Sequence, residues 1–504
     1  MLPAVTVNTA GSAPRGVVAA GHPLSAEAGA EALRAGGNAV DAALAAMLTS
    51  FAAEPLLTGL GAGGYMLVAP ADGEPLLLDF FVEVPGRGAD PAARAELVPV
   101  DVSFGDAVQM FNVGAASVGA YGVPRGICAA SERYGRIPLP ELAAPAAALA
   151  REGVPLNAEQ AYVVEILDGI VTLTPEIAAI YAPGGELLRE GDSVRQPELA
   201  DAIERLAAEG ARPFYEGDLA AKVVDLLVGQ GGLLTAADLA AYEVVSREPV
   251  RARYRGREVL TNPPPSAGGT LIALALALLE RDAPSPPTVE ALVAAMDATQ
   301  RERTPAFLDG LDEPGFLERF VAGRLGSTTH IAVIDSAGGA CSVTCSNGEG
   351  SGIVVPGTGI HLNNMLGEQD LNPLGFHMFP PGRRLPSMMA PTVVLRDGVP
   401  ELVLGSAGSN RIRSAILQTI VAVLDRELSA DEAVRAPRVH YEDGVVYVEP
   451  GIAVDRLEAD GHGIARFRGL NLFFGGVQAV EHDTATGAFS GGGDPRRGGA
   501  AVVA

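Results

Sequence analysis

A run of hydroxyl residues before an alternating apolar segment is the strongest candidate for chemistry in this chain. Gly326-Ser327-Thr328-Thr329-His330 follows a charged stretch and precedes that segment. A hydroxyl is a poor nucleophile near neutral pH, but a Thr that begins a chain can use its own α-amine as the base. An α-amine has a pKa of about 8, whereas an internal peptide nitrogen cannot accept a proton in this range. Chemistry at Thr328 therefore requires a cut between Ser327 and Thr328. The structural alternative is a strand start filled with β-branched residues, with His330 directed to solvent.

Motifs for several common enzyme classes are absent from the sequence. The chain has no His-Glu-x-x-His, no Gly-x-Ser-x-Gly, no EF-hand loop and no Gly-x-x-x-x-Gly-Lys. Lys222 is its single lysine and lies in a plain helical context, which disfavours P-loop and pyridoxal chemistry. The glycines at 59, 61, 63 and 64 precede an apolar strand pattern, whereas a dinucleotide-binding loop precedes a helix. We therefore expect no cofactor.

Charge and cysteine content narrow the class of partner. The 504 residues include 61 acidic and 36 basic side chains, a formal net charge of -25. This charge repels polyanions, so we expect neither nucleic acid nor an acidic membrane surface as a partner. Cys128, Cys341 and Cys345 form neither a zinc motif nor a disulfide framework, so we expect no metal site. No secretion signal or membrane-spanning run is recognisable, and the expected location is the cytoplasm.

The elements that would position Thr328 change in type along the chain. Ser25 is the expected cap of a helix ending at Gly36-Gly37, and Asn38 caps a second, almost wholly apolar helix to about Ala53. Further helical patterns cover 141–151, 197–209, 218–229 and 270–280, with a capping box at Thr235 and Asp238. Strand patterns cover 74–81 and 250–260, and hairpins are expected at 329–345 and 391–405. The charged stretch 306–326 is expected to be an exposed loop. We infer an α+β fold in which helices pack on antiparallel sheets.

Several different short motifs occur along the chain in a specific order. They are His22-Pro-Leu-Ser25, Gly36-Gly-Asn-Ala-Val-Asp-Ala-Ala43, Gly61-Ala-Gly-Gly-Tyr-Met-Leu67, Asn262-Pro-Pro-Pro-Ser-Ala-Gly-Gly269, Ser327-Thr-Thr-His330, Leu362-Asn-Asn364, Pro391-Thr392, Gly405-Ser-Ala-Gly-Ser-Asn-Arg-Ile412 and Gly493-Asp-Pro-Arg496. In this order and spacing, over nearly the whole chain, they resemble the γ-glutamyltranspeptidase family of N-terminal nucleophile hydrolases. The resemblance implies a four-layer αββα sandwich, with antiparallel sheets between helix layers. It also implies a precursor that cuts itself into a large subunit, 1–327, and a small catalytic subunit, 328–504, which stay together noncovalently.

The resemblance assigns catalytic roles to individual residues. Thr328 would attack an amide carbonyl, form an acyl-enzyme and pass the acyl group to water or to an amine. The backbone N–H groups of Gly408 and Ser409 would bind the oxyanion of the tetrahedral intermediate. Ser346 would orient the nucleophile, with Thr344 as the alternative.

The family's substrate-binding positions are only partly kept. Asn347 matches a residue that contacts the α-amino-acid end of the substrate, and Glu368 matches the acidic residue that binds the α-ammonium. Ser387 keeps the first hydroxyl of a Ser pair, and Met388 replaces the second. Phe81 stands where family members commonly carry an Arg that grips the α-carboxylate.

Replacing that Arg removes a charge-assisted clamp, so we expect glutathione to bind poorly. Arg87, Arg383 or Arg384 could supply the charge from another direction. Phe81 could also be ordinary core packing.

These observations leave three hypotheses. The first is a self-processing amidohydrolase or acyltransferase that cleaves a γ-glutamyl or related amide, a small molecule. The second is an acylase, or a hydrolase of specialised metabolism, for a non-glutamyl acyl group. The third is a non-catalytic relative that keeps the fold for binding or assembly. The sequence allows a homo-oligomer without requiring one.

Overall fold

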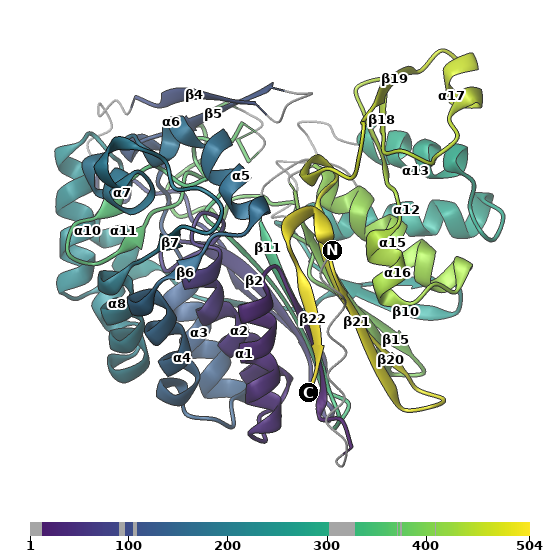
Figure 1. Ribbon diagram of the computed structural model, residues 1–504, viewed down its shortest axis with the longest axis horizontal. Helices are drawn as coiled ribbons and strands as arrows, with labels where there is room; N and C mark the ends of the chain where they lie inside the picture. Colours follow the sequence, from purple (N-terminus) through teal and green to yellow (C-terminus); the bar gives the residue numbers. More distant parts are fainter. Residues whose placement is uncertain are drawn as a thin grey trace.

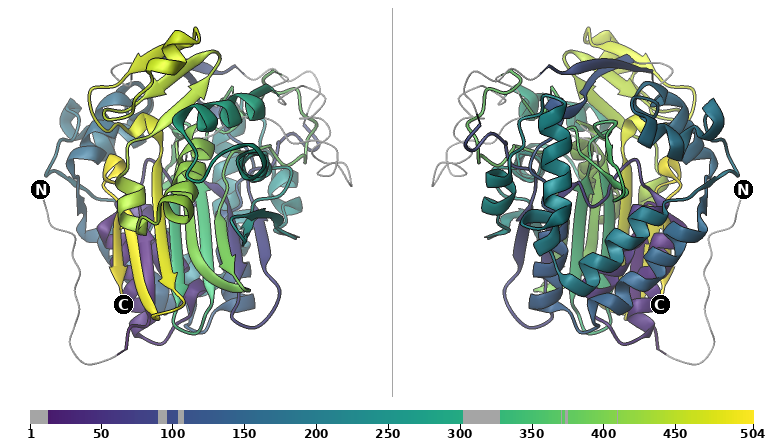
Figure 2. Two further views of the ribbon diagram at one scale, coloured as in Figure 1. Left: turned by 90° about the vertical axis from the view of Figure 1, so that its right-hand side faces the viewer. Right: turned by 90° about the vertical axis from the view of Figure 1, so that its left-hand side faces the viewer.

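Two antiparallel sheets form the centre of the molecule. The computed structural model describes residues 13–89, 96–103, 108–301, 328–369, 371–372, 375–408 and 410–504. The first sheet has the strand order β22 (Ala500–Val503), β1 (Gly16–Ala20), β11 (Thr329–Asp335), β12 (Ala340–Ser346), β2 (Gly63–Ala69), β3 (Leu76–Phe80) and β8 (Val245–Arg247). The second has the order β21 (Ala488–Gly493), β20 (Gly476–Asp483), β16 (Val399–Ala407), β15 (Thr392–Arg396), β10 (Arg257–Thr261) and β9 (Val250–Tyr254). Figure 2 shows these sheets from two sides, with their strands roughly vertical.

Helices cover the outer face of each sheet (Figure 1). The helices against the first sheet are α1 (Pro23–Arg34), α2 (Ala39–Ala53) and α3 (Val123–Tyr134); α4 (Leu139–Glu152) packs on α2, and α8 (Pro197–Glu209) on α4. The helices against the second sheet are α12 (Gly268–Asp282), α15 (Arg411–Arg426) and α16 (Ala430–Arg435), with α13 (Val289–Arg301) packed on α12. The α+β prediction with helices on antiparallel sheets is therefore confirmed.

Shorter elements surround this centre. The helices are α5 (Ala158–Ile166), α6 (Asp168–Val171), α7 (Pro175–Tyr181), α9 (Arg212–Tyr215), α10 (Asp218–Gly229), α11 (Ala236–Ala241) and α17 (Asp455–Ala459), with 3-10 turns η1 (Ala115–Ser117), η2 (Pro183–Gly185), η3 (Leu472–Phe474) and η4 (Pro495–Arg497). The small sheets pair β4 (Val98–Ser103) with β5 (Val108–Val113), β6 (Val154–Pro155) with β7 (Ser193–Val194), and β13 (Val354–Val355) with β14 (Ile360–His361). A further small sheet joins β17 (Val439–Glu442), β18 (Val445–Val448) and β19 (Gly463–Arg466).

Successive residues of β11 face different layers, as the period of two in a strand requires. Ala332 and Ile334 belong to the core between the two sheets. Ile331 and Val333 belong to the core shared with α2. Even-numbered side chains of β11 therefore point between the sheets, and odd-numbered ones point to the helices.

Most predicted helices form where the sequence pattern places them. Asn38 caps α2 in a capping box with Asp41, and all of α2 is buried. Thr235 and Asp238 form the expected box at α11. The cap predicted at Ser25 is wrong: His22 caps α1 through its ring, and Pro23 occupies the first helical position.

The strand predicted over 250–260 is a hairpin instead. β9 and β10 pair antiparallel around Arg255 and Gly256, both of which have positive φ. Gly256 adopts φ +73° without steric cost, so the chain reverses within a pattern that alternates as if continuous. The predicted loop 306–326 lies outside the described residues.

Candidate active site

Thr328 lies at the first position before β11. Thr329 pairs with Cys345 of β12, so one further step of the same antiparallel register places Thr328 opposite Ser346. Directly opposed side chains share a face of the sheet, here the face between the two sheets. Thr328 is 1% exposed, and its Oγ1 has no hydrogen-bond partner among the described residues. The Thr328 hydroxyl is thus buried just before β11 without a hydrogen bond to any described residue. Ser327, the other side of the predicted cut, lies outside the described residues.

The neighbouring polar side chains distinguish Ser346 from Thr344. Thr344 Oγ1 lies 2.7 Å from Nδ1 of His330, on the same face of the sheet. Burial lowers the pKa of His330 to about 3, so this ring is neutral near pH 7. Since Thr344 is committed to His330, Ser346 is the hydroxyl that the register sets against Thr328. The alternative with His330 directed to solvent is wrong, because its side chain is 1% exposed.

On the opposite face of β11, a buried carboxyl contacts Thr329, the residue that follows the candidate nucleophile. Thr329 Oγ1 donates to Glu54 Oε1 at 3.0 Å, where Glu54 directly follows α2. Burial raises the pKa of Glu54 to about 7, against hydrogen bonding from Thr329 and the charge of Arg497. Sequence reasoning missed Glu54. Its signal was an acidic residue, followed by Pro55, at the end of an otherwise apolar helix.

The chain after β12 forms a polar cluster around Gly348. Gly348 has φ +66°, and a Cβ there would lie 2.0 Å from Asn364 Oδ1 and 2.1 Å from Glu368 Oε1. Asn347 is fully buried, and neither its Oδ1 nor its Nδ2 has a hydrogen-bond partner within the described part of the chain. The Ser346 hydroxyl accepts from the Gly348 N–H at 2.7 Å. The predicted residues Ser346, Asn347 and Glu368 are thus brought together around one turn.

Gly408 connects β16 to α15. Its φ is +113°, and a Cβ at this position would lie 2.5 Å from the Cα of Gly475, so the turn requires glycine. The turn leads directly into the N-terminus of α15, where backbone N–H groups favour developing negative charge. Ser409, the second predicted oxyanion donor, lies outside the described residues.

The three remaining predicted positions make packing and backbone contacts. Phe81 is 1% exposed and stacks on Tyr65 with 5.3 Å between ring centroids. Met388 is fully buried in the same hydrophobic cluster as Phe81. Ser387 Oγ accepts from the Met389 N–H at 3.1 Å. Phe81 therefore occupies the core, as its packing interpretation requires.

All three arginines considered as substitutes contact other groups of the protein. Arg384 is 6% exposed and lies 3.5 Å from Asp79 and 3.4 Å from Glu83. Arg87 pairs with Glu83 at 3.0 Å. The guanidinium of Arg383 stacks over the Phe379 ring at 4.3 Å.

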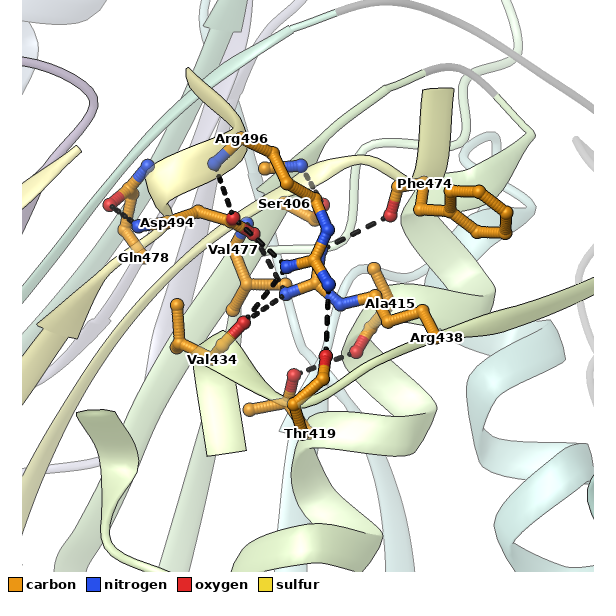
Figure 3. A network of polar contacts seen from close by, with 12 residues as sticks. Ser406, Ala415, Thr419, Val434, Arg438, Phe474, Val477, Gln478, Asp494 and Arg496 are labelled. Atoms are coloured by element: carbon orange, nitrogen blue, oxygen red, sulfur yellow. Dashed lines mark hydrogen bonds and ion pairs between the residues drawn. The ribbon is translucent and has the colours of Figure 1, made fainter. Parts of the chain in front are cut away.

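A buried ion-pair network lies next to the site (Figure 3). Asp494 accepts from Arg438 at 2.7 Å and from Arg496 at 3.1 Å. Arg496 also binds Glu449 through its Nε at 2.7 Å. These four side chains are 0–5% exposed. The network fixes η4, so it also sets the position of Arg497, which lies close enough to Glu54 to lower that group's pKa.

No described group of three or more His, Cys, Asp or Glu side chains is arranged to hold a metal ion. Within the same residues, no helix has the length and apolar character needed to cross a bilayer.

Comparison with known proteins identifies the family. The family model described as gamma-glutamyltranspeptidase matches residues 25–312 and 313–504. The chain belongs to the γ-glutamyltranspeptidase family. Within this family it is 33% identical over 516 residues to the Acylase ACY 1 proenzyme of Pseudomonas sp. (strain SE83), covering 95% of this chain and 92% of the relative. It is 30% identical over 546 residues to the glutathione hydrolase proenzyme of Bacillus subtilis (strain 168), covering 97% of this chain and 91% of the relative.

A solved structure shares the fold of this γ-glutamyltranspeptidase family member. The crystal structure of cephalosporin acylase from Bacillus halodurans superposes with a TM-score of 0.84 at 26% identity, covering 100% of this chain and 98% of the other. The family resemblance indicated by the motifs is therefore confirmed over nearly the whole length of the chain. The chain belongs to a family of hydrolases and acyl-transferring enzymes whose relatives bear both acylase and glutathione hydrolase names.

Proposed function

We propose that the chain is a precursor that cuts itself between Ser327 and Thr328 and then cleaves amides through an acyl-Thr328 intermediate. The observation that carries this proposal is the buried, unpartnered hydroxyl of Thr328, set opposite Ser346 at the start of β11. Relatives named as proenzymes support the processing step. The large subunit is then 1–327 and the small subunit 328–504. The two sheets and their helical covers support the four-layer αββα arrangement.

The chemistry follows from what the cut creates. The new α-amine of Thr328 accepts the proton of its own hydroxyl as Oγ1 attacks the amide carbonyl. The carbonyl oxygen becomes an oxyanion, stabilised by the N–H groups of Gly408 and Ser409 at the entry to α15. The C–N bond breaks, the leaving amine takes up the proton, and an ester to Thr328 remains. Water or an amine then attacks this ester and releases the acyl group, so the enzyme acts as a hydrolase or a transferase.

Some of the residues that bind substrate in the family are matched in this chain, and one is replaced. Asn347 and Glu368 lie together around Gly348, where they can bind a polar end of the substrate. Phe81 is buried in the core and offers no charge to a carboxylate. This observation favours the second candidate function, an acylase for a non-glutamyl acyl group, over a glutathione hydrolase. The acylase relatives are consistent with it.

Processing is tested by electrophoresis and intact mass of the purified protein. The wild type is expected to run as two unequal bands, with the smaller fragment beginning Thr-Thr-His-Ile. Thr328→Ala is expected to run as one band, because no hydroxyl remains to attack the preceding carbonyl. A cut at any other position, or a single wild-type band, contradicts the proposal and favours the non-catalytic relative.

Substrate class is tested with 4-nitroanilides. The γ-glutamyl anilide is compared with simple acyl anilides, with and without added amine acceptors. We expect higher kcat/KM for an acyl anilide. Strong, saturable cleavage of the γ-glutamyl anilide would show that a cation other than one at position 81 serves the α-carboxylate. The cytoplasmic location and a homo-oligomeric assembly stay predictions from the sequence.

A further inference from the structure

A chain of hydrogen-bonded side chains begins at Asn410, directly after the predicted oxyanion donors and directly before α15. Asn410 donates from Nδ2 to Glu442 Oε1, at the end of β17. The other carboxylate oxygen of Glu442 lies 3.4 Å from His440 Nε2. His440 Nδ1 lies 2.7 Å from the hydroxyl of Ser414, in the first turn of α15. The chain therefore leaves the start of α15, passes through β17 and returns to α15.

The charge of Glu442 sets the direction of these hydrogen bonds. Burial would raise the pKa of Glu442, but the bond from His440 and nearby arginines of α15 lower it to about 2. An ionised carboxylate only accepts, so Asn410 presents its NH2 group and His440 its Nε2–H. Burial lowers the pKa of His440, so the ring is neutral near pH 7 and its Nδ1 accepts from Ser414. Each contact in the chain thus has one donor and one acceptor.

Packing between the two sheets brings the turn after β16 near the candidate nucleophile. Gly405 of β16 lies against His330 of β11, since a Cβ on Gly405 would be 2.4 Å from the imidazole Cε1. Further from the start of β11, the Ser342 hydroxyl donates to the Leu404 carbonyl at 3.2 Å. Movement along the first sheet toward Thr328 therefore corresponds to movement toward the C-terminal end of β16. Thr328 and the turn that ends β16 consequently lie at the same end of the two packed sheets.

The turn after β16 depends on its neighbours for its orientation. Gly408 has φ +113° and no side chain of its own. Asn410 is 4% exposed, and Glu442 is the one hydrogen-bond partner of its side chain among the described residues. Arg411, the next residue, donates from Nε to the Phe473 carbonyl at 2.8 Å. The contact with Glu442 therefore restrains the chain directly after the oxyanion donors.

We propose that Glu442 is a positioning residue for catalysis. Through Asn410 it orients the turn whose backbone N–H groups receive the oxyanion, while His440 and Ser414 hold the Glu442 carboxylate in place. Oxyanion donors act only when negative charge develops on the carbonyl oxygen, so their misplacement slows the chemical step and leaves substrate binding unchanged. This inference rests on the proposed function, because it needs acyl transfer to Thr328.

The test follows the burst of 4-nitroaniline from whichever of the γ-glutamyl and simple acyl anilides the wild type cleaves fastest. The maximum burst rate reports acylation, and the half-saturating substrate concentration reports binding. Glu442→Ala is expected to lower the maximum rate by about 10- to 100-fold, since loss of one oxyanion donor costs about 100-fold or more, and to leave half-saturation unchanged. Rates are given per cut chain, with the cut fraction taken from intact mass.

An exchange of donor and acceptor separates positioning from general stability. Asn410→Asp faces Glu442 with a second carboxylate and should lower the burst rate to a similar extent. Adding Glu442→Gln to Asn410→Asp restores one donor and one acceptor and should recover most of the lost rate. The matched control is Glu401→Gln. Glu401 is 8% exposed, lies near the start of β16 and pairs with Arg257 at 2.7 Å, so this variant should lower stability and keep the wild-type burst rate.

The outcomes separate this inference from the proposed function. Absence of self-cutting and of anilide hydrolysis in the wild type contradicts the proposed function. Wild-type activity with an unchanged burst rate in Glu442→Ala, or a rise in half-saturation that accounts for the whole loss, overturns the role of Glu442. Failure of the exchanged pair to recover the rate, at a wild-type urea midpoint, does the same. Asn410→Asp and the exchanged pair decide the question if Glu442→Ala does not fold or does not cut itself.

Discussion

Two clusters of buried polar groups lie close together and differ in how they are satisfied. Around η4, Asp494, Arg496, Glu449 and Arg438 pair with one another at 2.5–3.1 Å. At the strand ends, Thr328 Oγ1 and the side-chain amide atoms of Asn347 and Asn364 have no hydrogen-bond partner among the described residues.

This difference separates structural from functional polar groups. A buried polar group without a partner costs free energy, so proteins rarely keep one unless something else binds it. The paired cluster is complete and holds the chain rigidly. The unpaired cluster keeps donors and acceptors available, and a substrate amide can supply the missing partners. Mutations should therefore act on stability in the first cluster and on turnover in the second.

The largest expected effect is loss of stability in the paired cluster. Burial alone would raise the pKa of Asp494, but Arg438 and Arg496 lower it below its ordinary value. Asp494→Asn leaves two buried guanidinium groups without a full counter-charge, so the free energy of unfolding should fall by about 3–5 kcal/mol, measured by urea denaturation. Asp431→Asn breaks an exposed pair with Arg435 and should cost less than about 1 kcal/mol. Equal losses in the two variants would contradict the comparison.

Glu54 lies between the two clusters and should couple stability to pH. Below about pH 4.5 its carboxyl is protonated in both the folded and unfolded states. As the pH rises toward 7, only the unfolded chain ionises, so the free energy of unfolding falls by about 3 kcal/mol and then levels off. Glu54→Gln should remove this fall, measured by urea denaturation between pH 4 and 8.

The Glu54 experiment is best done in the Thr328→Ala background, where a single uncut chain unfolds. Glu165→Gln, at an exposed position of α5, serves as the control. An identical pH dependence in both variants would show that Glu54 ionises as freely in the folded protein as in the unfolded chain.

Mutations in the unpaired cluster should instead lower catalytic activity. Asn347→Ala should lower kcat/KM by roughly 10- to 100-fold, because a substrate contact is lost, and should leave the unfolding free energy nearly unchanged, because no internal hydrogen bond breaks. Asn363 is the matched control. Its amide donates to the carbonyls of Gly61 and Gly119 and accepts from the Gly119 N–H, so Asn363→Ala should lower stability by about 2 kcal/mol or more. A large stability loss in Asn347→Ala would place that residue in the structural class.

The smallest expected effect separates two neighbouring hydroxyls. Ser346→Ala should slow self-cutting and turnover by about tenfold, because the group opposite Thr328 is lost. Thr344→Val should instead cost about 1 kcal/mol of stability through its lost bond to His330, with a smaller effect on rate. Single-turnover rates and urea midpoints distinguish the two. The reverse pattern would transfer the orienting role to Thr344.

The parts of the fold that the sequence predicts are those with local signals. Asn38 and Asp41 lie three residues apart and define the start of α2. The β11–β12 hairpin follows from alternation around a Gly-rich turn. The predictions that are wrong also concern short segments. The His22 ring, not Ser25, caps α1, and Gly256 lies in a turn within a segment whose apolar and polar residues alternate as in one continuous strand.

Only those site residues that match the family's motifs can be predicted from the sequence. The family resemblance assigns Thr328, Ser346 and Asn347, which lie within one hairpin and its following turn. Glu54 and Arg497 come from opposite ends of the sequence and meet only in the folded chain. Neither has a local pattern, since a lone charged residue after a helix or in a short turn is usually solvated. Long-range packing decides their role.

The strand order has a consequence for the proposed cut before Thr328. β1, from the segment before Thr328, lies between β22 and β11, both from the segment after it. The second sheet likewise joins β15, from after the cut, to β10, from before it. Cutting that one peptide bond would therefore give two chains that share both sheets. They can separate only if the hydrogen bonds between their neighbouring strands break in both sheets. Heat or denaturant should release the fragments together in one step, and fragments made separately should fail to assemble.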